Sequence, residues 1–207
     1  MSETICVTTA YYPPVQYFFH MGRHPAVWIE QYESYGKQSY RNRCRILSAN
    51  GVLTLSVPVS QKNGGKFLTR EAEIDYSENW QRLHLRTIAS AYKNSPFYDY
   101  YIDELRPFFE KKERYLLDLN NAILSKLLEI IGLQREIHLT EEYVAVLPEG
   151  SDLREVIHPK EARRKAPDPL FTARPYTQTF AERFPFEANL SILDLLFCTG
   201  PEATAYL

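Results

Sequence analysis

Cysteine is scarce in this 207-residue sequence, and its few positions form no pattern. Cys6, Cys44 and Cys198 are an odd number, lie far apart and include no Cys-x-x-Cys pair. A disulfide framework needs paired cysteines, and a zinc knuckle needs closely spaced ones. We therefore expect reduced thiols, a cytoplasmic protein and no metal held by these residues.

Long apolar runs and an excess of charge of one sign are also missing. The chain has 24 Lys and Arg against 26 Asp and Glu, a formal net charge of -2. Such a balance gives no overall field that would attract a nucleic acid backbone or an anionic membrane. No stretch reaches the roughly 18 apolar residues of a membrane span, and the first residues form no secretory leader. We expect neither a nucleic acid partner nor insertion into a membrane.

Glycine is rare, with 8 residues, and the glycine-rich motifs of cofactor and nucleotide sites are absent. The sequence contains no Gly-x-Gly-x-x-Gly, no Gly-x-Ser-x-Gly and no His-Glu-x-x-His. Gly64-Gly65-Lys66 comes nearest to a phosphate-binding loop, but Phe67 follows where that motif requires Ser or Thr. The sequence therefore indicates no particular cofactor.

Tyrosine, in contrast, is abundant, with 15 residues. Many of them gather in three clusters, Tyr11–Tyr17, Tyr32–Tyr40 and Tyr92–Tyr101. Tyrosine combines a large apolar ring with a polar hydroxyl, so each cluster fits either a core with satisfied hydroxyls or the wall of a binding site. We predict that the rings converge on one cleft bordered by Asn42, Arg43 and His84.

The order of β-like and helical patterns predicts an α/β or α+β fold in a single domain over residues 1–207. The part up to about residue 76 is β-rich, with short strands around Val7 and Trp28. Asn50-Gly51 between two β-rich runs predicts a hairpin over Ser39–Val59. The alternation of acidic and apolar residues over Glu71–Tyr76 predicts a further sheet element.

The second half of the chain is predicted to be helical. The expected helices cover residues 77–91, 97–109 with an interruption at Pro107, 115–131 ending at Gly132, and 187–197. Residues 148–175 are rich in proline and charge and predict a long surface loop. Within that loop, the imidazole of His158 beside Lys160 is a candidate for contact with an anionic ligand, although a solvated loop is the commoner case.

Three ionisable side chains are candidates for catalysis. His84 shares a helical stripe with Trp80 and Ile88, so it is either a hydrogen-bonded core residue or a general acid or base. Asp194 lies on the apolar stripe of the last helix and needs a partner, either a structural one or a histidine that it orients. Glu30 ends a predicted strand, the place where ligands bind in parallel α/β sheets.

Arginines alternate along the first strand of the predicted hairpin. Arg41, Arg43 and Arg45 share one face and could grip an anionic ligand. They could equally pair across the sheet with the alternating acids of residues 71–75, and we favour this pairing for Arg41 and Arg45. Asn42 faces the other side among apolar residues, where a buried amide must find partners, which makes it a site candidate.

Several segments together resemble the WbqC-like family. They are the run from Ile29 to Ile46, Asn50-Gly51, Leu55–Val59, Trp80–His84, Ala91-Tyr92, Pro96-Phe97 and the ending Asn189–Phe197 before Gly200-Pro201. Family members often have Gln-Pro before the early Tyr-x-Pro and Asp at the position of Glu30, and this chain has neither. The family pattern falls on Tyr12, Glu30, Tyr40, Asn42, Arg43, Trp80, His84, Tyr92, His158 and Asp194.

The resemblance implies a role in bacterial surface-polysaccharide or O-antigen biosynthesis, with a nucleotide-linked or lipid-linked amino sugar as the ligand. We expect an enzyme, for example an acyl or aminoacyl transferase, in which His84, Glu30 and Asp194 act in catalysis. The expected substrate-binding residues are Tyr12, Tyr40, Asn42, Arg43, Tyr92 and His158. The alternatives are a non-catalytic sugar-binding protein and a scaffold that contacts other biosynthetic enzymes; a homo-oligomer is compatible with each.

Overall fold

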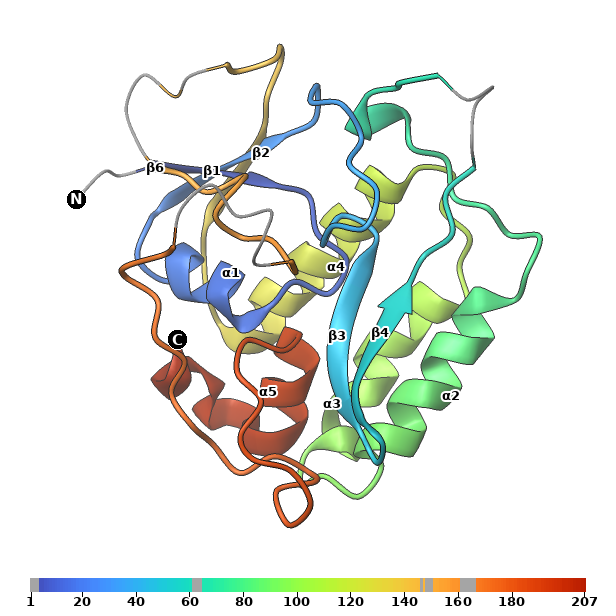
Figure 1. Ribbon diagram of the computed structural model, residues 1–207, viewed down its shortest axis with the longest axis vertical. Helices are drawn as coiled ribbons and strands as arrows, with labels where there is room; N and C mark the ends of the chain where they lie inside the picture. Colours follow the sequence, from blue (N-terminus) through green and yellow to red (C-terminus); the bar gives the residue numbers. More distant parts are fainter. Residues whose placement is uncertain (1–3, 61–64, 146, 148–150, 161–166) are drawn as a thin grey trace.

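The computed structural model describes residues 4–60, 65–145, 147, 151–160 and 167–207. Its centre is a parallel sheet of four strands in the order β5-β2-β1-β6 (Figure 1). The strands are β1 (Thr4–Thr8), β2 (Ala26–Glu30), β5 (Glu136–Leu139) and β6 (Ser151–Asp152). In β1, Ile5, Cys6 and Val7 are all buried, as expected for a parallel strand that is covered on both faces.

The strand order has a consequence for ligand binding. Going along the chain, β1, β2 and β5 follow one another in one direction across the sheet, and β6 then returns to the other side of β1. Such a reversal is the switch point of an open parallel sheet, where ligands bind beyond the carboxyl ends of the strands. The helices α1 (Val15–Met21) and α4 (Leu116–Ile131) lie in the connections between the first three strands.

The predicted hairpin is confirmed. It consists of β3 (Arg43–Ser48) and β4 (Gly51–Ser56), paired antiparallel with Ser48 opposite Gly51. Ala49 and Asn50 form the turn, and Gly51 has a φ of 95°, in the region where a side chain would be strained. Asn50-Gly51 therefore predicts the hairpin correctly because the turn needs a residue with positive φ at position 51.

The remaining helices are α2 (Trp80–Tyr92), α3 (Tyr98–Leu105) and α5 (Ile192–Thr199), with 3-10 turns at Thr69–Glu71, Arg106–Phe109 and Gly200–Tyr206. They gather around the hairpin, where α2 and α5 both contact β3 (Figure 1). As predicted, the chain is interrupted at Pro107, and α4 ends at Gly132, whose φ is 77°. Asn79 rather than Ser77 caps α2, by accepting a hydrogen bond from the Arg82 N–H at 3.3 Å. The prediction of a mixed α/β fold is confirmed.

Two local predictions differ from the structure. Residues 71–76 do not form a continuous strand. Their backbone makes only isolated β-bridges, between Ile74 and Val59 and between Glu73 and Tyr115. Residues 148–175 include the short strand β6, and the buried side chains of Leu153 and Ile157 anchor the segment after it. Residues 148–150 and 161–166 of this predicted loop lie outside the described part.

Most tyrosines of the three clusters belong to the core. Tyr11, Tyr12, Tyr17 and Tyr92 are each at most 1% exposed, and their rings join one continuous apolar cluster with the sheet and helices. The prediction that these rings converge on one cleft is therefore wrong. Burying a large ring in the core stabilises the folded state more than leaving it exposed at the wall of a cleft. Among the described helices, none combines the length and apolarity needed to cross a bilayer.

Candidate functional site

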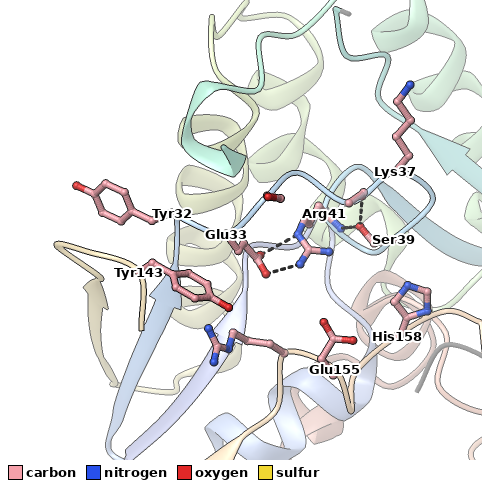
Figure 2. A pocket seen from close by; sticks show the side chains of 11 residues that line it. Tyr32, Glu33, Lys37, Ser39, Arg41, Tyr143, Glu155 and His158 are labelled. Atoms are coloured by element: carbon pink, nitrogen blue, oxygen red, sulfur yellow. Dashed lines mark hydrogen bonds and ion pairs between the residues drawn. The ribbon is translucent and has the colours of Figure 1, made fainter. Parts of the chain in front are cut away.

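A cleft of about 500 Å³ lies beyond the carboxyl ends of the parallel strands, and we call it the strand-end cleft. Each of three strands is followed by residues that line it: Tyr32, Glu33 and the loop to Arg41 after β2, Tyr143 after β5, and Arg154, Glu155 and His158 after β6 (Figure 2). Its size is within the range of small-molecule sites, and its place is the one that the strand order indicates.

A buried ion network forms the floor of the strand-end cleft. The guanidinium of Arg154 donates to both carboxylate oxygens of Asp152, at 2.9 and 2.6 Å, and to the carbonyl of Val144 at 2.7 Å. Its Nη1 also lies 3.4 Å from Oε2 of Glu30. Arg154 therefore joins the ends of β6 and β2 to the segment after β5.

Glu30 is the fully buried centre of this network. Its carboxylate accepts hydrogen bonds from the Tyr32 N–H at 2.7 Å, the Thr140 hydroxyl at 3.0 Å and the Val144 N–H at 2.9 Å, in addition to Arg154. A carboxylate that is 0% exposed and accepts four hydrogen bonds has no lone pair directed to a ligand. The predicted position of Glu30 at a strand end is correct, and its contacts make it a positioning residue of the cleft.

A second ion pair forms a wall of the strand-end cleft. Arg41 donates from Nε to one oxygen of Glu33 at 2.8 Å and lies with Nη2 2.6 Å from the other, which is a bidentate contact (Figure 2). Burial raises the pKa of the Glu33 carboxyl, and the Arg41 charge opposes this effect. The favoured pairing of Arg41 with the acids of residues 71–75 is wrong, because that segment does not run beside β3. Glu73 instead accepts from Arg114.

The groups in the strand-end cleft with capacity for a ligand come from the segment after β6 and from the aromatic rim. Figure 2 shows the Glu155 carboxylate directed toward the space in front of Arg41, with His158 beside it. Within the described part of the chain, no hydrogen bond or ion pair engages Glu155. Nδ1 of His158 lies 3.0 Å from the backbone nitrogen of Lys160 and 3.2 Å from its carbonyl oxygen, so the backbone at Lys160 fixes the orientation of the ring. Tyr143 adds an exposed ring at the rim.

His84 lies elsewhere, in a buried group that we call the His84 cluster, formed by His84, Tyr11 and Trp80. Its Nδ1 is 3.0 Å from the hydroxyl of Tyr11, and its ring centre lies 5.1 Å from that of Trp80. Burial lowers the pKa of His84 to about 4, so the ring is neutral at pH 7. His84 lines none of the described pockets and is not placed beside Glu30 or Asp194.

Asp194 and Tyr92 form a third group, in the core between α2 and α5. Asp194 accepts from the hydroxyl of Tyr92 at 2.8 Å, from the hydroxyl of Tyr176 at 2.7 Å and from the Gln178 amide at 2.8 Å. Burial raises the pKa of the Asp194 carboxyl, while these three donors oppose the rise. The sequence predicted a partner for this buried carboxylate, and the structure supplies three neutral ones.

The other predicted binding residues are divided between the core and a second pocket. The Tyr12 ring stacks on Phe109 with centres 5.7 Å apart, and Tyr40 is buried with its carbonyl accepting from the Tyr11 N–H at 2.9 Å. Asn42 and Arg43 line a smaller pocket that adjoins the strand-end cleft. Of the nine predicted site residues, His158 alone lines the strand-end cleft, with Glu30 in its floor.

Most residues of the strand-end cleft are not among the predicted site residues. Arg154 and Glu155 follow a strand of only two residues, which is too short to show a period of two. Tyr143 follows the edge strand β5, which has four residues. The available signal was positional, because acidic and basic residues after a strand of a parallel sheet are ligand candidates.

Metal and thiol chemistry receive no support from the described residues. Among them, no group of three His, Cys, Asp or Glu side chains is placed to hold a metal ion. Burial raises the pKa of Cys6 and of Cys198 to about 12, and it raises that of Cys44 as well. Neutral thiols are poor nucleophiles, and Cys6 and Cys44 are in addition buried in the core.

Comparison with known proteins gives one family and one relative. The model of the WbqC-like protein family matches residues 9–165. A protein of Mycobacterium tuberculosis (strain H37Rv), named Uncharacterized protein Rv1507c, is 27% identical over 196 residues, which cover 84% of this chain and 83% of the relative. No solved structure matches. The matched range contains the residues of the strand-end cleft from Tyr32 to His158.

Proposed function

The chain belongs to the WbqC-like protein family, and from this premise we propose that it is an enzyme that modifies a nucleotide- or lipid-linked amino sugar bound in the strand-end cleft. The observation that carries the proposal is the composition of this cleft. Two carboxylates, an imidazole and two tyrosines surround a space of about 500 Å³ at the carboxyl ends of a parallel sheet.

These side chains suit a sugar. Carboxylates accept hydrogen bonds from sugar hydroxyls, and a tyrosine ring offers an apolar face with a polar hydroxyl at its edge. Because Arg41 and Arg154 are held by Glu33 and Asp152, they shape the cleft without supplying unbalanced charge to its centre. Glu155 and Tyr143 are the groups that we expect to contact the sugar.

The proposed reaction is acyl or aminoacyl transfer to the sugar amine. As the amine nitrogen attacks the carbonyl carbon of the donor, it must lose a proton, and the donor's leaving group must gain one. An imidazole in a polar cleft can perform both transfers near neutral pH. We assign this role to His158, whose Nδ1 is held by the Lys160 N–H.

A ligand-binding experiment tests the site. We expect nucleotide sugars or amino sugars to raise the Tm of the wild-type protein, since a ligand that binds only the folded state stabilises it. Glu155→Gln should lose most of this shift, while the matched variant Glu110→Gln, at an exposed carboxylate outside the cleft, should keep it. Equal shifts in both variants would place the ligand elsewhere, and no shift with any sugar would contradict the proposal.

A second experiment separates an enzyme from a sugar-binding protein, the alternative that the tyrosine-rimmed cleft also fits. Product formation from an amino sugar and an acyl or aminoacyl donor is followed by mass spectrometry. We expect His158→Gln to retain sugar binding and to lose turnover by about a hundredfold or more. A wild-type protein that binds the sugar but forms no product with any donor would favour the binding function.

A further inference from the structure

A second, smaller pocket adjoins the strand-end cleft, separated from it by the loop that contains Gly36 and Lys37. It has a volume of about 210 Å³ and is lined by Lys37, Asn42, Arg43 and Ser60, among others. The stacked rings of Tyr35 and Phe67, with centres 5.1 Å apart, form part of its wall. Because Lys37 lines both spaces, we call the smaller one the Lys37–Arg43 pocket and regard the two as neighbouring parts of one site.

The charges of the two spaces differ. In the strand-end cleft, Arg41 and Arg154 each make a bidentate contact with a carboxylate. The Lys37–Arg43 pocket has two cations and, among the described residues that line it, no carboxylate. No ion pair within the described part of the chain engages Lys37 or Arg43. In a protein with a formal net charge of -2, this is a local excess of positive charge.

Two residues that line this pocket also have buried polar atoms without a partner. Nε of Arg43 and Oδ1 of Asn42 are both buried and have no hydrogen-bond partner among the described residues. The other end of the Asn42 amide is fixed, because its Nδ2 donates to the Val57 carbonyl at 2.9 Å. A buried donor or acceptor without a hydrogen-bond partner lowers the stability of the folded state. Both residues line the pocket, so a ligand with anionic oxygens and a hydroxyl group would lie beside the Arg43 guanidinium and the Asn42 amide.

The direction of Lys37 supports the same conclusion. Figure 2 shows its side chain leading away from the Glu33–Arg41 pair. A further cation reaches the loop between the two spaces, because the Lys160 ammonium donates to the side-chain carbonyl of Gln38, which lines the same pocket. Cations from two segments that are distant in sequence, Lys37 and Arg43 from one and Lys160 from the other, therefore lie at or beside this pocket.

We propose that the Lys37–Arg43 pocket binds the phosphate or diphosphate group of the substrate while its sugar lies in the strand-end cleft. This inference rests on the proposed function and deepens it by assigning a place to the phosphate group of the substrate. Nucleotide diphosphate sugars and sugar 1-phosphates are two sources of the same chemistry. A pocket of about 210 Å³ is smaller than most sites for whole small molecules, which suits a subsite for one group. Arginine and lysine are the residues that bind phosphate oxygens most often.

Calorimetric titration with inorganic pyrophosphate tests the subsite. We expect binding to the wild-type protein that weakens as salt is added, since the contact is between exposed charges. Lys37→Gln should weaken it roughly tenfold, and Lys37→Gln combined with Arg43→Gln should weaken it further. The matched double variant Lys93→Gln with Arg183→Gln removes the same charge at exposed positions outside both spaces and should bind as the wild type does. Lys37 is exposed, so its single variant keeps the test valid if the double variant does not fold.

Glucose and glucose 1-phosphate, with UDP-glucose as the nucleotide source, distinguish a failure of this inference from a failure of the proposed function. Stronger binding of the phosphorylated sugars than of glucose, lost in Lys37→Gln, supports the inference, and the ratio between UDP-glucose and glucose 1-phosphate identifies the source. Equal binding of glucose and glucose 1-phosphate, or pyrophosphate binding that Lys37→Gln leaves unchanged, overturns the phosphate subsite. In that case a sugar shift that depends on Glu155 still leaves the proposed function standing.

Discussion

The His84 cluster and the strand-end cleft each contain a histidine beside aromatic rings, but in different settings. The His84 ring is 3% exposed and lies against Trp80 and Tyr11, whereas His158, which is 9% exposed, lines a space of about 500 Å³. The first histidine comes from the apolar stripe of a helix and the second from a segment that follows a strand. A polar residue on an apolar stripe is buried with the stripe, and residues after parallel strands remain available to a ligand.

The electrostatic consequences follow from these settings. Burial lowers the pKa of His84 to about 4 and raises that of Asp194, so the core disfavours the charged form of each group. The strand-end cleft keeps its charges by pairing them, as Arg154 with Asp152 and Arg41 with Glu33. We therefore expect substitutions in the core groups to change stability, and substitution of Glu155, which has no ion pair among the described residues, to change ligand binding.

The largest loss of stability is expected for Arg154→Met. Arg154 lines the strand-end cleft, but its substitution should affect stability as a substitution in the core does. Removing the guanidinium leaves the fully buried Glu30 without its cation, and breaking a buried pair in this way costs about 3–5 kcal/mol. Urea unfolding followed by circular dichroism measures the loss. Adding Glu30→Gln to Arg154→Met should restore part of it by removing the stranded charge. If the second substitution adds a full further loss, the two residues act independently and the network is not as described.

The next effect is expected at Asp194. Asp194→Ala removes the acceptor of the Tyr92 and Tyr176 hydroxyls and of the Gln178 amide, and leaves these donors buried. We expect a loss of about 2–4 kcal/mol in the free energy of unfolding. Sugar binding measured at a temperature where the variant is folded should be unchanged, because Asp194 does not line the strand-end cleft. If the folded Asp194→Ala protein no longer binds the sugar, the prediction is wrong and Asp194 takes part in ligand binding.

Features of the fold that depend on neighbouring residues could be predicted from the sequence, whereas features that depend on contacts between distant segments could not. The hairpin and the ends of α4 were predicted correctly because each depends on a few neighbouring residues, such as Gly51 and Gly132 with their positive φ angles. The partner of Arg41 was predicted wrongly because it depends on which segment lies beside β3. That choice is made by packing across the whole domain.

The strand-end cleft shows the same limit for the site. Its residues come from three stretches, Tyr32–Arg41, Tyr143 and Arg154–His158, which only the parallel order β5-β2-β1-β6 brings together. A strand of two residues such as β6 carries too little pattern to be predicted, and without β6 the switch point is not visible. The family resemblance pointed to His158, which lines the strand-end cleft, and equally to His84 and Asp194, which lie in the core.

A smaller effect, specific to pH, is expected for the His84 cluster. The folded state holds His84 with a pKa near 4, below the usual value of about 6.5 for an exposed histidine, so the unfolded state binds the proton first as the pH falls. Wild-type stability should therefore decrease by about 1 kcal/mol more than that of His84→Gln between pH 7 and pH 5.5. Tyr11→Phe removes the hydrogen bond but keeps the buried ring, so it should retain the wild-type pH dependence.

The smallest effect on stability and the sharpest contrast with the core is expected at Glu155. Its carboxylate is exposed and has no ion pair among the described residues, so Glu155→Gln should change the free energy of unfolding by less than about 0.5 kcal/mol. The same substitution should nevertheless weaken sugar binding, because the uncharged amide accepts a weaker hydrogen bond from a hydroxyl than the carboxylate does. Measuring both quantities on one preparation separates them. A Glu155→Gln protein that loses several kcal/mol of stability would show that Glu155 belongs to the ion network of Arg154, and the division between a structural core and a ligand-binding cleft would then have to be drawn at His158 and Tyr143.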